Sequence, residues 1–152
     1  MIRINRRLIN GCPAAMAQIR GSYKYPGLRG HIAFFSAPNG TIVLTDISGL
    51  PTDNGFFALH IHNGNSCTGT AEKPFADAGT HLDFDSDMHP FHTGDLPVIL
   101  SNNGYAWSAV YTQRFTPDQV KGYTAIIHIK PDDYRTQPSG DSGEMIACGV
   151  IR

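Results

Sequence analysis

The sequence predicts a single-domain, all-β protein, built as an antiparallel sandwich or flattened barrel with two long functional loops. The 152 residues fit one domain that buries its own core. The 16 glycines and 10 prolines favour turns and short strands over long helices. Short β-rich runs also recur between turn signals. We expect an N-terminal lead-in over residues 1–28, irregular or partly helical in its first twenty residues, and a β domain over 29–152.

The first half of the β domain contains a predicted hairpin and a third strand. Residues 31–35 and 41–45 are rich in β-branched and aromatic side chains, and they flank Asn39-Gly40. Asn-Gly between two such runs is a strong hairpin signal. Residues 55–62 form the next predicted strand.

The second half repeats this pattern around one helical turn. Residues 96–100 and 105–111 flank Asn102-Asn103-Gly104, which predicts another hairpin. Thr116 followed by Pro117 is typical of the start of a short helix. Two further strands are predicted over 124–130 and 145–151.

Two polar stretches, 63–95 and 131–143, show no sustained periodicity. Loops of that length in a compact domain are usually functional. The chain has a net charge of −1, so we expect neither nucleic acid nor a membrane as a partner. The basic first ten residues are not followed by an apolar segment, so we identify no signal peptide. The compartment stays open between the cytoplasm and export after processing.

Histidine is concentrated in one part of the sequence. The chain has seven histidines, and five of them lie between residues 60 and 92. His60 and His62 are two residues apart on a predicted strand, so they share a face and can bind one ion. His128 stands on another apolar strand, where a hydrogen-bonded core histidine is the alternative.

The first long loop adds His81, His89, His92 and Asp95. Three imidazoles and one carboxylate make a complete tetrahedral zinc set, and three or four neutral imidazoles suit copper(II). No cysteine lies at zinc-finger spacing, and no serine or cysteine has the setting of a nucleophile. The residues therefore predict a site for one or two metals on a β scaffold.

The ordered set of motifs resembles the Cu,Zn superoxide dismutases, especially the bacterial branch, over residues 30–152. The matching residues are His60-x-His62, Cys67, Gly79-x-His81, His89, His92-x-Gly94-Asp95-Leu96-Pro97, His128-x3-Asp132-Asp133 and Ala147-Cys148-Gly149. The resemblance implies a Greek-key fold. It also implies an enzyme that converts superoxide to oxygen and hydrogen peroxide by cycling copper(II) and copper(I) beside a structural zinc.

The same resemblance implies a role for each matching residue. The implied copper ligands are His60, His62, His81 and His128, and the implied zinc ligands are His81, His89, His92 and Asp95. His81 would release copper(I), carry a proton and bind again. Asp132 would join a copper ligand to a zinc ligand. Cys67 and Cys148 would form a disulfide, two buried thiols being the alternative, whereas Cys12 falls outside the pattern.

Two departures from the family pattern stand out. Met145 occupies the position where the family usually carries an arginine beside copper. We hypothesise that Arg135, or Lys130, supplies the missing positive charge for substrate guidance, ordinary solvated charges being the alternative. Only Pro90 and Phe91 separate His89 from His92, which shortens the zinc loop, and we expect Phe91 to pack against it.

Two functional hypotheses remain at this point. The first is the superoxide dismutase, and the second is a non-catalytic copper- and zinc-binding relative for metal storage or transfer. A homodimer is also expected from the resemblance. Tyr105, Trp107 and Tyr111 alternate along one strand, where they line either an interface or the core.

Overall fold

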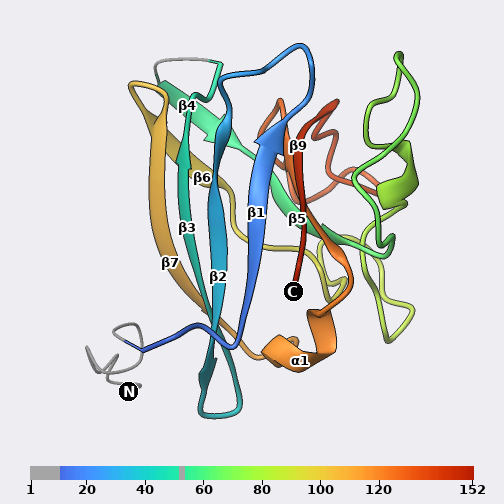
Figure 1. Cartoon of the computed structure of the whole chain (residues 1–152). Coiled ribbons are helices and arrows are strands. Elements are labelled where there is room, and N and C mark those ends of the chain that lie inside the picture. Colours follow the sequence, from blue (N-terminus) through green and yellow to red (C-terminus); the bar gives the residue numbers. More distant parts are fainter. Residues whose placement is uncertain (1–10, 52–53) are drawn as a thin grey trace.

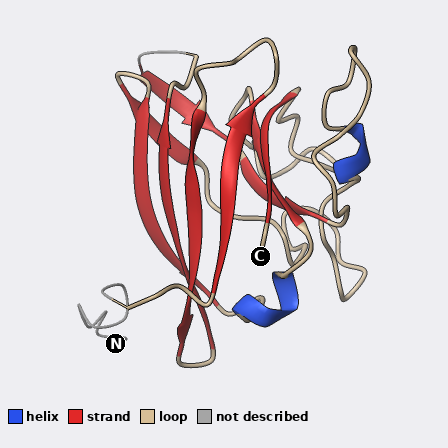
Figure 2. Ribbon diagram, viewed as in Figure 1, coloured by secondary structure: helices blue, strands red, loops and turns tan. Residues whose placement is uncertain are grey.

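The computed structural model describes residues 11–51 and 54–152, and this part of the chain is almost entirely strand and loop (Figures 1 and 2). The strands are β1 (Ala15–Gly21), β2 (Arg29–Ala37), β3 (Gly40–Ser48), β4 (Asn54–Phe57), β5 (Leu59–His62), β6 (Ile99–Asn102), β7 (Tyr105–Thr112), β8 (Thr124–His128) and β9 (Met145–Val150). The helical elements are the short α1 (Pro117–Val120) and the 3-10 turn η2 (Ala76–Ala78). The prediction of an all-β fold is confirmed.

The strands form one antiparallel sheet whose two edges come from a single stretch of chain. Their order is β4-β6-β7-β3-β2-β1-β9-β8-β5. The edge strands β4 and β5 are consecutive and are separated by Ala58 alone. The Ala58 amide donates to Lys130, and its carbonyl accepts from His128. The sheet therefore curls into a nearly closed barrel, and the single strand predicted over 55–62 is divided between its opposite edges.

The barrel interior is apolar, as alternation along the strands requires. On β1, Ala15, Ala17 and Ile19 are buried, and the residues between them are exposed. The expectation of an irregular or partly helical lead-in is wrong for Ala15–Gly21, which pairs with β2 and β9. Pairing and burial override the helical preference of this alanine-containing segment. Residues 1–10 of the expected lead-in lie outside the described residues.

The predicted turns are present. Asn39 takes a positive φ of 56° before Gly40, and the β6–β7 turn places Asn103 and Gly104 at φ 51° and 75°. Asparagine and glycine tolerate this left-handed region, which explains both hairpins. The helical turn begins at Pro117, where the Gln119 side chain accepts a hydrogen bond from the Thr116 amide at 2.8 Å.

A disulfide ties the first long loop to the barrel. Cys67 and Cys148 are bonded over a sequence separation of 81 residues, as the resemblance implied. The bridge packs with Phe75 and Ile126. Closing a loop of this length stabilises the folded state by about 4–5 kcal/mol in a chain-entropy model. Cys12 is a free, exposed thiol.

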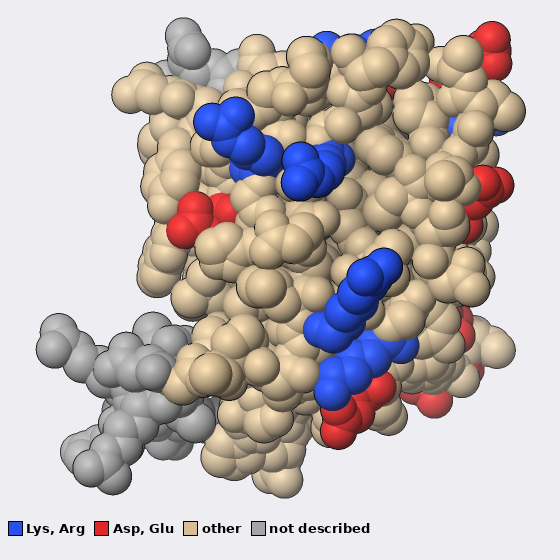
Figure 3. Space-filling model, viewed as in Figure 1, with Lys and Arg blue, Asp and Glu red and all other residues tan. Residues whose placement is uncertain are grey.

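Charge is spread over the barrel surface in separate groups. Arg20 and Arg29 lie opposite each other on β1 and β2, and Figure 3 shows groups of Lys and Arg side chains on this face. In the described ranges, no helix is long and apolar enough to cross a membrane.

Candidate metal centre

Six histidines and two aspartates meet beside β5, under the two long loops. Most of these side chains are buried, and His92 is half-buried. Their ligand atoms form two groups, within each of which the atoms lie no more than 4.8 Å apart. The first group is His60, His62, His81 and His128, and the second is His81, His89, His92 and Asp95.

Strand β5 positions the first two histidines by simple alternation. Ile61 points into the barrel core, so His60 and His62 point to the opposite face. The first long loop runs along this edge, where the Ile61 amide donates to Gly94 and the Leu82 amide donates to Ile61. Gly94 has no room for a side chain, because a Cβ there would collide with the Ile61 carbonyl. This close approach brings His81 and Asp95 beside β5.

Two histidines of the first group direct bare ring nitrogens at each other. His62 Nδ1 lies 2.9 Å from the Gly79 carbonyl, and His128 Nδ1 lies 3.0 Å from the Gly143 carbonyl. A carbonyl only accepts, so both Nδ1 atoms carry the proton and both Nε2 atoms carry a lone pair. These two Nε2 atoms are 3.3 Å apart. Two acceptors at this distance repel unless a cation lies between them.

The other two histidines of this group also present unpaired nitrogens. His60 Nδ1 and His81 Nε2 are buried without a hydrogen-bond partner. Buried polar atoms are rarely left unsatisfied, so orphaned atoms in one small space need an explanation. Four neutral imidazoles suit copper(II), and the donor set fits that ion.

The second group surrounds the Asp95 carboxylate. His81 Nδ1 lies 2.7 Å from Asp95 Oδ1. The Nδ1 atoms of His89 and His92 lie 3.1 and 3.2 Å from Asp95 Oδ2. Neither of these two nitrogens makes a hydrogen bond, so lone pairs and carboxylate converge on a common point. Three imidazoles and one carboxylate fit tetrahedral zinc, and His81 gives one nitrogen to each group.

Asp132 joins the two groups from behind. Its Oδ2 lies 2.8 Å from His60 Nε2, and its Oδ1 lies 2.9 Å from His89 Nε2. Both rings donate to the carboxylate, which leaves their Nδ1 atoms facing inward. The resemblance implied such a double contact for Asp132, and its two partners are His60 and His89.

Burial and hydrogen bonding set the charge of these groups. Burial lowers the pKa of His62 well below its ordinary value and that of His128 to about 3, and neighbouring imidazoles add to the effect. Burial also lowers the pKa of His60, despite its bond to Asp132. Although burial opposes it, hydrogen bonds from histidines lower the pKa of Asp95 and Asp132. At neutral pH these three imidazoles are therefore neutral and both carboxylates are ionised, the states in which they bind metal.

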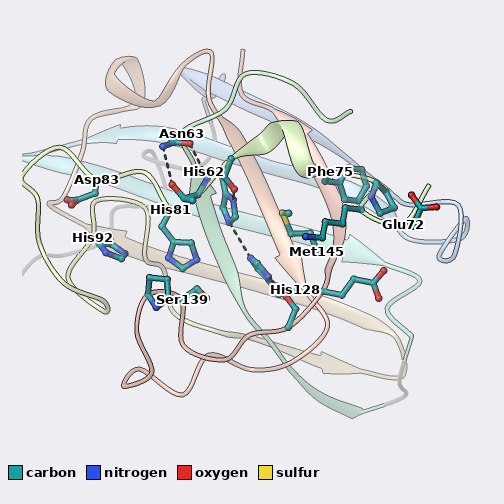
Figure 4. Close-up of a pocket in the computed structure, with 17 residues that line it drawn as sticks. His62, Asn63, Glu72, Phe75, His81, Asp83, His92, His128, Ser139 and Met145 are labelled. Atoms are coloured by element: carbon teal, nitrogen blue, oxygen red, sulfur yellow. Dashed lines mark hydrogen bonds between the residues drawn. The ribbon is translucent and has the colours of Figure 1, made fainter. Parts of the chain in front are cut away.

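A cavity of about 820 Å³ opens onto the first group. Figure 4 shows the rings of His62, His81 and His128 lining it together with Met145. Among the described residues that line the cavity, Lys73 is the one lysine or arginine. The carboxylates on its wall are Glu72, Asp83 and Glu144, of which Glu144 pairs with Lys24 at 2.7 Å.

The cations expected from the sequence lie elsewhere. Arg135 is exposed and is not among the residues that line the cavity. Lys130 is also absent from the lining and contacts Asp141 at 3.3 Å. Sequence reasoning missed Lys73, although it follows Cys67 closely in the loop that the disulfide fixes to β9.

The shortened zinc loop is held differently from our expectation. Phe91 is 65% exposed and does not pack the loop. Instead, Arg114 Nη1 donates to the carbonyls of Pro90, His92 and Asp95, each at 3.0 Å. This side chain follows β7 and reaches the loop only in the folded barrel, so no local sequence signal identified it.

The fold and the site together define a β-barrel metalloprotein with two adjoining histidine-rich sites that share one imidazole. The family model for copper/zinc superoxide dismutase (SODC) matches residues 28–151. The chain belongs to the copper/zinc superoxide dismutase family.

Individual relatives agree with this assignment. The chain is 33% identical to the superoxide dismutase [Cu-Zn] of Deinococcus radiodurans over 141 residues, covering 81% of this chain and 76% of the relative. It is 32% identical to the Escherichia coli K12 protein of the same name over 137 residues, with 81% and 78% covered. The solved Cu/Zn superoxide dismutase of Brucella abortus superposes with a TM-score of 0.79 at 26% identity, covering 91% of this chain and 99% of that one.

Gly140 offers a direct test of the contact between Asp132 and His89. A Cβ at Gly140 would collide with the Asp132 carboxylate and the His89 ring. We expect Gly140→Ala to weaken zinc binding about 10- to 100-fold, because the carboxylate that orients His89 must move. Gly122→Ala is the matched control, since Gly122 also has a positive φ but open space around it. Zinc affinities measured by chelator competition decide the matter, and equal affinities in the two variants would contradict this account.

Proposed function

We propose that the protein disproportionates superoxide to oxygen and hydrogen peroxide, with copper at His60, His62, His81 and His128 and zinc at His81, His89, His92 and Asp95. The observation that carries this proposal is His81, which directs one ring nitrogen to each group. An imidazole shared in this way couples the two sites through a single ring. Membership of the family supports the same assignment.

The protein residues have separable roles in this reaction. Copper, when bound, exchanges single electrons with superoxide, which zinc cannot do. We propose that His81 holds a proton at Nε2 and gives it to the reduced substrate, which takes its second proton from water to become hydrogen peroxide. Its Nδ1 stays beside Asp95 throughout. Asp132 holds the rings of His60 and His89 in a fixed orientation. The neighbours of His81 therefore stay in place while its Nε2 gains and loses the proton.

The non-catalytic alternative has no observation in its favour. A protein for copper or zinc storage or transfer has no need of an imidazole shared between two buried groups. Three of the four copper-side histidines, His62, His81 and His128, also line an open cavity that a small anion can enter. The enzyme is therefore the function that the geometry supports best.

Direct measurement of superoxide decay tests this function. After loading with both metals, we expect the decay rate in pulse radiolysis to rise in proportion to protein concentration. The zinc-only form should be inactive, because it has no redox-active ion. His128→Gln should lose activity while its zinc-binding group stays intact. Full occupancy of both sites without turnover would favour the non-catalytic relative.

We further propose that a cation guides superoxide to the cavity in place of the family's arginine. Met145 is neutral, and two cations are candidates, Arg135 from the sequence and Lys73 from the structure. Lys73 lines the cavity, whereas Arg135 does not. A charge acts most strongly on substrate within a Debye length, about 8–10 Å at ordinary ionic strength. We therefore favour Lys73.

Paired substitutions separate the two candidates. Lys73→Gln should slow turnover roughly two- to tenfold at low ionic strength and flatten its dependence on salt. Arg135→Gln removes the same charge elsewhere on the surface and should change neither quantity. The reverse pattern would restore Arg135 as the guiding residue, and no effect from either would end the proposal of steering by these side chains.

A homodimer is proposed on the outer face of β4, β6 and β7. Tyr105 and Trp107 are 45% and 54% exposed, so they are not core residues. Phe56 and Leu100, which pair across β4 and β6, are 53% and 45% exposed and extend this apolar surface. Contiguous exposed apolar side chains of this kind favour an interface.

Sedimentation velocity tests the dimer. We expect a species of twice the chain mass at micromolar concentration, and Trp107→Glu should shift it to the monomer by placing a charge in the contact. Gln18→Glu, on the exposed side of β1, adds the same charge away from this face and serves as the control. A monomer at every concentration would contradict the proposal.

A further inference from the structure

Met145 stands directly beside the copper-side histidines. It is the first residue of β9 and pairs with His128 across β8 and β9, where the register of the two strands shifts. Side chains opposite each other in an antiparallel pair share a face, with Cβ atoms about 4.5–5.5 Å apart. Met145 lines the same cavity as His62 and His128, and Figure 4 shows its sulfur next to that pair.

The surroundings of Met145 hold its side chain in place without using its sulfur. The residue is half-buried and packs against Phe75, Ile126 and Cys148. These neighbours are apolar, and the disulfide at Cys148 fixes the loop that carries Phe75. Among the residues that the structure describes, none donates a hydrogen bond to the Met145 sulfur. Its lone pairs therefore stay available on the side that faces the cavity.

A thioether at this position has a specific chemical consequence. It is neutral, so it cannot attract an anion as an arginine does. It is also soft and polarisable, and soft sulfur ligands favour copper(I). His60, His62 and His128 offer three nitrogens that no other group shares, whereas His81 also belongs to the second group. Under the proposed function His81 carries its proton in the reduced state, so a fourth donor would be needed most at that stage.

We propose that the Met145 thioether is a ligand for copper(I) in the first group, next to His62 and His128. This inference rests on the proposed assignment of copper to that group. It makes Met145 a metal-binding residue that favours the reduced ion, rather than an inert replacement for a guiding cation. Met145 is not proposed as a ligand of zinc, which would bind to the second group on the other side of His81.

X-ray absorption on the anaerobic, copper(I)- and zinc-loaded protein tests the ligand directly. We expect a copper–sulfur scattering shell in the unaltered protein and its loss in Met145→Leu, which keeps size and apolarity. Met88→Leu is the matched control, because Met88 is 71% exposed and is not part of the cavity wall. It should leave the sulfur shell unchanged.

Affinity gives a second readout. In competition with bicinchoninate, Met145→Leu should bind copper(I) about tenfold more weakly, and its copper(II) affinity should stay the same, because imidazoles hold that ion. A tenfold loss for the reduced ion alone lowers the reduction potential by about 59 mV for one electron. Direct potentiometry checks this shift independently.

The outcomes separate this inference from the function on which it rests. Nitrogen-only scattering in the unaltered protein, with equal copper(I) affinities, would overturn the Met145 ligand and leave the dismutase intact. Failure of the unaltered protein to bind copper at the histidines would overturn both. The spectrum of the unaltered protein decides the question even where Met145→Leu is unstable, and melting of the zinc-loaded variants shows whether each is folded.

Discussion

The structure around the metal centre depends on where the imidazole protons are placed. Rings buried this closely would repel if their lone pairs met without a cation, and would be costly to bury if they were charged. The Gly79 and Gly143 carbonyls accept hydrogen bonds from the N–H groups of His62 and His128. The Asp132 carboxylate accepts hydrogen bonds from those of His60 and His89. Every remaining nitrogen is thereby turned inward. The acceptors that bind the outer nitrogen of each ring thus leave the inner nitrogens with a surplus of unpaired lone pairs. Divalent cations can bind to these lone pairs.

Barrel closure determines where that surplus forms. The chain passes from one edge of the sheet to the other at Ala58, so β5 is an edge strand with Ile61 against the core and His60 and His62 on the opposite face. An uncovered edge is a liability, and here the first long loop covers it through backbone hydrogen bonds around Ile61. Gly94 permits the contact, and Arg114 holds the returning loop through three carbonyls. Protection of the edge and assembly of the two groups therefore have the same structural cause.

Local chemistry explains which features were predictable from sequence. Asn39-Gly40 and Asn103-Gly104 revealed the hairpins, because few residues accept a positive φ. The two metal groups and the disulfide were predictable because each required residue stands in a recognisable order. By contrast, β1 is defined by its partners rather than by propensity, and the division of the edge strand at Ala58 reflects closure of the whole barrel. Lys73 and Arg114 become functional candidates only through contacts with distant loops.

The replacement of an arginine by Met145 changes what attracts the substrate. Glu72 and Asp83 lie on the cavity wall with Lys73, and Glu144 is compensated by Lys24. The side chains alone therefore provide little net attraction for an anion. Bound divalent ions are the largest charges in such a site, and buried charges are screened less by salt than surface ones. Copper and zinc, when bound, would therefore supply most of the positive charge, to which Lys73 adds on the cavity wall, and the contribution of copper would fall on its reduction. A neutral sulfur donor would stabilise the reduced ion at that stage without adding negative charge to the path of the second superoxide.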